Sequence, residues 1–138
     1  PASAKSKGYF FKYKGVSVTM NGAAKKLIKK AGKPSKKTVK KSCAYKGKDR
    51  TYTYKDFQLK TYSKTNNGAE YVSEIRFRSN KAVTKEGIRI GSSLKDVTKK
   101  YGKAKARFGV YTFKKGSSKL QIMLNGNKVS AIRYFASK

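Results

Sequence analysis

The 138-residue chain contains no histidine, no tryptophan and a single cysteine. Without histidine it cannot form a Ser-His-Asp or Cys-His catalytic arrangement, or a zinc site that uses histidine. One cysteine cannot form an internal disulfide bond or a cluster of metal-binding thiolates. No apolar run approaches the roughly 20 residues that span a membrane. We therefore expect a protein that is not an enzyme, with no catalytic residues, no metal, no cofactor and no transmembrane segment.

Acidic residues are also scarce, because six Asp and Glu stand against 36 Lys and Arg. The formal net charge is +30. The acids are scattered, and no pair is spaced for general acid–base chemistry. The chain nevertheless has 10 Tyr and 7 Phe, which is too many aromatic residues for a disordered polycation. Its length suits one domain, so we expect a folded core beneath a strongly cationic surface.

Short motifs occur twice, in the same order, in the two halves of the chain. The matching pairs are Gly15–Val18 with Gly87–Ile90, Tyr52–Lys55 with Tyr111–Lys114, and Val72–Phe77 with Val129–Tyr134. The separation between matching residues falls from 72 to 57, so the second copy is shorter. This pattern predicts a flexible tail at residues 1–8 and two related units at 9–79 and 80–138, which together form one compact domain.

Each unit is predicted to contain one strand, a short helix and then three strands. The first helix covers 23–31, where apolar residues recur at helical spacing before Gly32. The second begins at Ser93, which Asp96 follows three residues later, and ends at Gly102.

Strands are expected in β-rich segments between turn signals. In the first unit these segments are Arg50–Tyr54, Phe57–Ser63 and Glu70–Arg78, the last with Tyr71, Ser73, Ile75 and Phe77 on one face. Two hairpins are expected, one at Lys14–Gly15 after Tyr9–Tyr13 and one at Asn125–Gly126. The predicted fold class is α+β, with each helix packed on one face of an antiparallel sheet.

The segment GIRIGSSLKDVTKKYG, residues 87–102, resembles the start of the repeat in the beta-lactamase-inhibitor-protein-like and outer-membrane-lipoprotein-like superfamily. In that superfamily a strand ending at Gly leads to a short helix that closes at Gly. The tandem units are also similar to secreted or lipoprotein domains of this type, and the resemblance covers most of residues 9–136. It implies a tandem α+β fold, an extracellular or cell-envelope location and a protein-binding role, with no catalytic residues. The acidic contact residues of the inhibitors are scarce here.

Positive charge is densest at residues 25–41. This segment contains no acid and nine lysines: Lys25, Lys26, Lys29, Lys30, Lys33, Lys36, Lys37, Lys40 and Lys41. One interpretation is a surface for an anionic partner, such as a polyanionic glycan, a cell-wall polymer, an anionic membrane or an acidic protein. The other is a solvated face without a ligand, or a deliberately supercharged scaffold. Nonspecific nucleic-acid binding is expected at low salt, but the excess of Lys over Arg disfavours base-specific recognition.

Four tyrosines and the cysteine leave further alternatives open. Tyr45, Tyr52, Tyr54 and Tyr62 recur at strand spacing. They are either contact residues of an inhibitor-like, protein-binding surface or core and cross-strand packing residues. We expect Cys43 to be a small buried apolar residue rather than a nucleophile.

Overall fold

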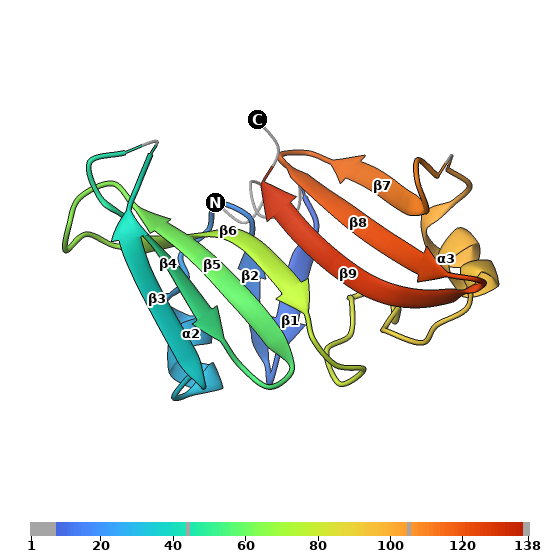
Figure 1. Ribbon diagram of the computed structural model, residues 1–138, viewed down its shortest axis with the longest axis horizontal. Coiled ribbons are helices and arrows are strands. Elements are labelled where there is room, and N and C mark those ends of the chain that lie inside the picture. Colours follow the sequence, from blue (N-terminus) through green and yellow to red (C-terminus); the bar gives the residue numbers. More distant parts are fainter. Residues whose placement is uncertain (1–7, 44, 105, 137–138) are drawn as a thin grey trace.

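The computed structural model describes residues 8–43, 45–104 and 106–136, so the predicted tail lies outside the described residues apart from Gly8. The described part is an α+β fold dominated by antiparallel strands, as predicted. The elements are β1 (Phe10–Tyr13), β2 (Val16–Thr19), α2 (Lys25–Ala31), β3 (Lys36–Lys41), β4 (Lys48–Thr53), β5 (Phe57–Ser63), β6 (Glu70–Phe77), α3 (Leu94–Tyr101), β7 (Val110–Lys115), β8 (Ser118–Asn125) and β9 (Lys128–Ala136). Within these residues, β1 and β2 form a hairpin, and the other seven strands form one sheet in the order β3-β4-β5-β6-β9-β8-β7 (Figure 1).

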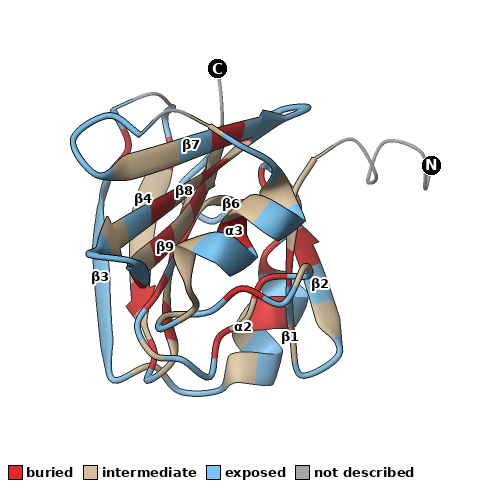
Figure 2. Cartoon of the chain, turned by 90° about the vertical axis from the view of Figure 1, so that its right-hand side faces the viewer, coloured by how far each residue is buried: buried red, intermediate tan, exposed pale blue. Residues whose placement is uncertain are grey.

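The hairpin and both helices lie on one face of this sheet, which we call the covered face (Figure 2). The core fills the space between these layers. Phe11 of the hairpin, Leu27 of α2 and Val97 of α3 are buried there with the inward side chains of the strands. The ring of Phe11, for example, lies 5.2 Å from that of Phe57 on β5. Among the described residues, no helix lies on the opposite face of the sheet, which we call the open face.

Local turn and cap chemistry agrees with the sequence in several places. Lys14 and Gly15 both have positive φ, as a tight two-residue hairpin turn requires. Ser93 caps α3, since its hydroxyl accepts a hydrogen bond from the Asp96 amide at 3.1 Å. The hairpin that joins β8 to β9 and the bounds of β5 are also confirmed, although the two central turn residues are Gly126 and Asn127, because Asn125 still pairs with Lys128.

Two predictions about strands are wrong. The first half has an additional strand, β3, which the sequence analysis did not anticipate in the run of lysines. The segment Gly87–Ile90, in contrast, is not a strand. There the Ile88 amide donates a hydrogen bond to the Thr84 hydroxyl at 2.9 Å, and no strand of the described part of the chain pairs with this segment as β1 pairs with β2. Ile88 is nevertheless buried in the core, so its apolar side chain reflects burial and not pairing within a sheet.

A β-bulge changes which side chains of β6 share a face. Thr61 pairs with Val72 and Lys60 with Glu74, so Ser73 is an extra residue. Val72 is therefore buried on the covered face, and Tyr71 lies opposite Tyr62 on the other face. The predicted grouping of Tyr71 and Ser73 with the buried Ile75 and Phe77 is wrong for this reason.

The two halves of the sheet meet between β6 and β9 through three residue pairs: Glu74 with Phe135, Ile75 with Tyr134, and Arg76 with Arg133. The start of β6 pairs instead with residues 21–24. Its three backbone hydrogen bonds run from Asn21 N to Val72 O, from Val72 N to Gly22 O and from Ala24 N to Glu70 O. The start of β9 makes the same set: from Gly91 N to Val129 O, from Val129 N to Ser92 O and from Leu94 N to Asn127 O.

Candidate binding surface

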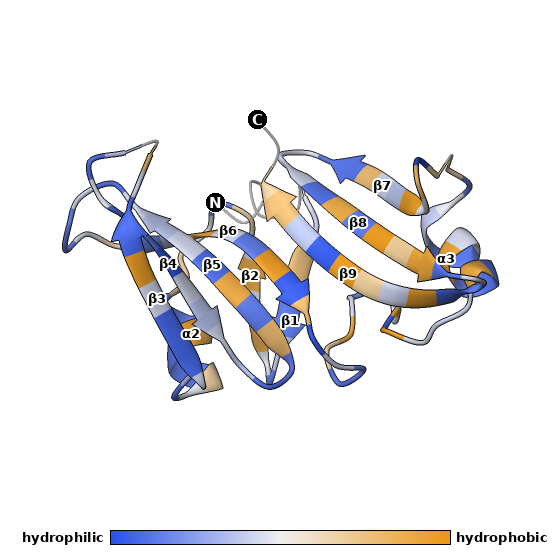
Figure 3. Ribbon diagram, in the orientation of Figure 1, coloured by the Kyte–Doolittle hydropathy of each residue, from blue (hydrophilic) through white to orange (hydrophobic). Residues whose placement is uncertain are grey.

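All nine lysines of residues 25–41 are exposed. Four lie on α2, four lie on β3, and Lys33 lies in the connection between these two elements. Figure 3 shows β3 as mostly hydrophilic, with one hydrophobic band. Since the segment contains no acid, its charges are not neutralised by any neighbour in sequence. We refer to these nine residues as the lysine surface.

The lysine surface wraps around an edge of the sheet instead of occupying one face. In the register of β3 with β4, Lys36 and Lys40 lie opposite Thr53 and Asp49 on the open face. Lys37 points to the covered face, where its ammonium lies 5.1 Å from the centre of the Tyr52 ring. Lysines on an edge strand also hinder pairing with other chains, so β3 has a structural reason for its composition besides any ligand.

One cationic side chain next to this surface was missed by the sequence analysis. Lys14, at the tip of the β1–β2 hairpin, lines a depression of 590 Å³ together with Val16, Lys26, Lys29 and Lys30. The relevant signal was the turn at Lys14–Gly15, but sequence does not show that this turn lies beside α2.

Two of the acids, Glu70 and Glu86, lie away from the lysine surface and accept hydrogen bonds within the fold. The Oε1 atom of Glu70 accepts hydrogen bonds from the Tyr52 and Thr61 hydroxyls, each at 2.7 Å. Burial, together with the hydrogen bond to Glu70, raises the pKa of Tyr52. On the other half of the chain, Glu86 accepts a hydrogen bond from Tyr101 at 2.6 Å. These contacts hold Glu70 and Glu86 in the fold, whereas Asp49 lies opposite Lys40 of the lysine surface.

The four tyrosines proposed as contact residues separate into two pairs. Tyr52 and Tyr54 are 3% and 5% exposed and belong to the core, so they cannot present their rings to a partner. Tyr45 is 41% exposed, and its ring stacks on that of Tyr62 with centroids 5.1 Å apart and planes 15° apart. Only this second pair remains as a candidate contact among the four.

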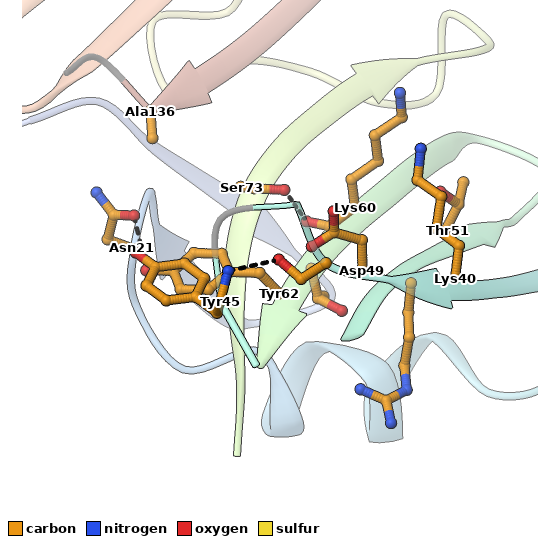
Figure 4. Close-up of a pocket in the computed structure, with 12 residues that line it drawn as sticks. Asn21, Lys40, Tyr45, Asp49, Thr51, Lys60, Tyr62, Ser73 and Ala136 are labelled. Carbon is orange, nitrogen blue, oxygen red and sulfur yellow. Dashed lines mark hydrogen bonds between the residues drawn. The ribbon is translucent and has the colours of Figure 1, made fainter. Parts of the chain in front are cut away.

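Tyr45 and Tyr62 line a pocket of 520 Å³ at the open-face end of β3, β4 and β5 (Figure 4). The two rings lie side by side at one end, and the ammonium groups of Lys40 and Lys60 lie at the other, with Asp49 between them. The Tyr62 hydroxyl donates a hydrogen bond to Asn21 Oδ1 at 2.9 Å, which fixes the ring. Burial is the main cause that raises the Tyr62 pKa. The arrangement offers a flat apolar surface, two cations and one anionic acceptor.

Cys43 lies in the loop between β3 and β4 and is exposed, so the expectation that it is buried is wrong. Across the described ranges, no helix has the length and apolar character needed to cross a membrane.

The protein-family models, the curated proteins and the solved structures that were compared with this chain include no match to it.

Proposed function

We propose that the chain is a non-enzymatic, extracytoplasmic binding domain that holds an anionic partner through the lysine surface. The observation that carries this proposal is the exposure of all nine lysines in a 17-residue segment without a single acid. A stretch of this kind produces a positive potential that attracts polyanions and concentrates them near the surface.

The chemistry of lysine favours diffuse rather than base-specific recognition. Its ammonium group is a hydrated point charge, whereas discrete phosphates and guanine edges are best recognised by the planar fork of arginine. The chain has 30 Lys and 6 Arg. Binding should therefore depend steeply on salt and little on the sequence of the polymer, as expected for a glycan or cell-wall polymer.

We also propose that the domain consists of two related units, as the superfamily resemblance implies. Three backbone hydrogen bonds join residues 21–24 to β6, and the same three join residues 91–94 to β9. The amide donors Asn21 and Gly91 are 70 residues apart, and their acceptors Val72 and Val129 are 57 apart. The separation of 57 is that of the motifs Val72–Phe77 and Val129–Tyr134, and the separation of 70 is that of the similar segments Lys25–Lys33 and Lys95–Lys103. This agreement supports a duplication and makes the second half an internal control for the first.

The test compares two charge-matched variants. In the first, Lys29, Lys30, Lys36 and Lys37 become Gln, which removes four charges from α2 and β3. In the control, Lys99, Lys100, Lys114 and Lys115 become Gln, which removes four exposed charges from the last turn of α3 and the opposite edge strand, β7. Each variant also removes one contact between an ammonium group and a tyrosine ring, because Lys37 lies over Tyr52 and Lys115 lies over Tyr9.

Affinity for heparin is measured by titration across a range of salt concentrations. The first variant should bind more weakly than the control, and its plot of log affinity against log salt should be flatter by up to about one unit for each lost contact. A second candidate is a cationic surface without a preferred ligand, which the structural roles of the acids favour. Equal losses in the two variants would support that candidate and contradict the lysine surface.

A further inference from the structure

We propose that the pocket at the open-face end of β3, β4 and β5 binds one ring of an acidic saccharide, with Tyr45 as its stacking platform. This inference rests on the proposed function and narrows the class of ligand. The proposed function describes the partner only by its negative charge, and the pocket adds that the partner contains sugar rings.

The platform is supported from beneath by two further rings. Tyr45 stacks on Tyr62, whose ring centroid lies 5.6 Å from that of Tyr71. Tyr62 is also held by its hydrogen bond to Asn21. The Tyr45 ring is thus fixed on one side by aromatic contact while much of its surface remains exposed. A flat ring supported in this way can stack against the apolar face of a pyranose with little loss of side-chain entropy.

Strand register brings the polar groups of the pocket onto the same face as the platform. Lys40 pairs with Asp49, Asp49 with Tyr62, and Tyr62 with Tyr71, so these four side chains form one row across four strands. Lys60 lies in the neighbouring row and also lines the pocket. The volume of 520 Å³ falls within the roughly 300–1,000 Å³ of typical ligand pockets.

Asp49 distinguishes a saccharide from other polyanions. A carboxylate accepts hydrogen bonds from sugar hydroxyls, and a polyphosphate chain offers no such donors. Lys40 and Lys60 can hold the carboxylate or sulfate of the same sugar at the far end of the pocket. Since Lys40 also belongs to the lysine surface, a glycan seated here can continue along β3 toward Lys36.

The test uses three probes: a heparin-derived octasaccharide, inorganic polyphosphate of matched charge, and a single-stranded oligothymidylate. Tyr45→Ala should weaken octasaccharide binding about five- to tenfold, in line with the loss of one stacking contact. It should leave polyphosphate binding within about twofold, because polyphosphate has no ring to stack. The control is Phe108→Ala, which removes a fully exposed ring from the loop before β7, and thermal unfolding checks that both variants are folded.

Each outcome bears on one proposal or both. A selective loss of octasaccharide binding supports the pocket. If Tyr45→Ala weakens oligothymidylate binding as much as octasaccharide binding, the ring is a general stacking surface. If it weakens polyphosphate binding as much, the substitution acts indirectly, through the charged groups nearby. Either result, or no change with any probe, overturns the pocket while leaving the lysine surface standing. If the unmodified protein binds none of the probes at physiological salt, the proposed function fails and the pocket fails with it.

Discussion

The N-terminus of α2 lacks the residues that usually stabilise a helix start, and two substitutions there should raise the stability of the protein. The residue before α2 is Ala24, which makes no side-chain cap, and the first turn contains no acid. By comparison, α3 has both the Ser93 cap and Asp96 in its first turn. Changing Lys25 and Lys26 to Glu should therefore stabilise the protein, because negative charge is favourable at the N-terminus of a helix.

The size of the effect follows from the spacing of the lysines on α2. Lys25 lies four residues before Lys29, and Lys26 four residues before Lys30, so both pairs repel. Replacing repulsion by attraction changes each pair by about 0.4–1 kcal/mol. With the interaction at the helix terminus, the total is about 2 kcal/mol. At roughly 2.1 cal/mol/K of unfolding entropy per residue, a chain of this length should melt about 7 °C higher.

The assay is thermal unfolding followed by circular dichroism at about 0.02 M and about 0.5 M salt. The rise in melting temperature should be largest at low salt, because the Debye length there is several times longer. The control is Lys99→Glu with Lys100→Glu in the last turn of α3, where acids oppose the helix dipole and should destabilise. Unchanged melting of the α2 variant at low salt would refute the reasoning that these lysines impose a cost on the helix.

Two further predictions concern the pocket loop and the core tyrosines. Gly47→Ala should destabilise by about 1–3 kcal/mol and weaken octasaccharide binding, because the new Cβ would overlap the backbone carbonyl of Ser63 behind the Tyr45 loop. Denaturant unfolding measures this loss, with Lys46→Ala as the neighbouring control, and equal stability of the two variants would contradict the expected overlap. Burial raises the pKa values of Tyr52, Tyr101 and Tyr134 above their ordinary value of 10.0, so their contribution to stability is complete below pH 10 and declines as the pH rises above it. An alkaline titration should show these three hydroxyls ionising together with unfolding, and tyrosinate absorbance from all tyrosines with native circular dichroism would disprove it.

The parts of the fold that depend on local chemistry were predictable from sequence. The cap at Ser93 and the hairpin between β8 and β9 each depend on few neighbours, and the bounds of β5 follow from its alternation of buried and partly buried side chains. Strand β3 was missed because lysine is uncommon in strands, and a lysine-rich strand is stable here only as a sheet edge. An edge position is a property of the whole sheet, which local patterns do not contain.

The candidate pocket was only partly predictable for a similar reason. Tyr45 and Tyr62 were recognised as possible contacts, but so were Tyr52 and Tyr54, which are buried. The alternation of side chains along one strand shows which of them share a face of the sheet, but it does not show which face the helices and the hairpin cover. The bulge at Ser73 then moves Tyr71 beneath Tyr62, a rearrangement that no spacing rule along β6 would give.

Under the duplication proposed above, the register between β6 and β9 has a consequence for the ancestry of the molecule. Arg76 and Arg133 are counterparts in the matching motifs, and they pair with each other. A local two-fold axis therefore runs between them, as in a symmetric dimer of a shorter chain. Two identical cations facing each other repel, and Glu74 relieves this by lying 3.5 Å from Arg76 and 3.7 Å from Arg133. Its counterpart is Ala131, so one acid serves both arginines. In a homodimer both subunits have the same sequence, so the acid would be present at both positions or at neither. Fusion of the two genes would let one half keep Glu74 while the other has Ala131.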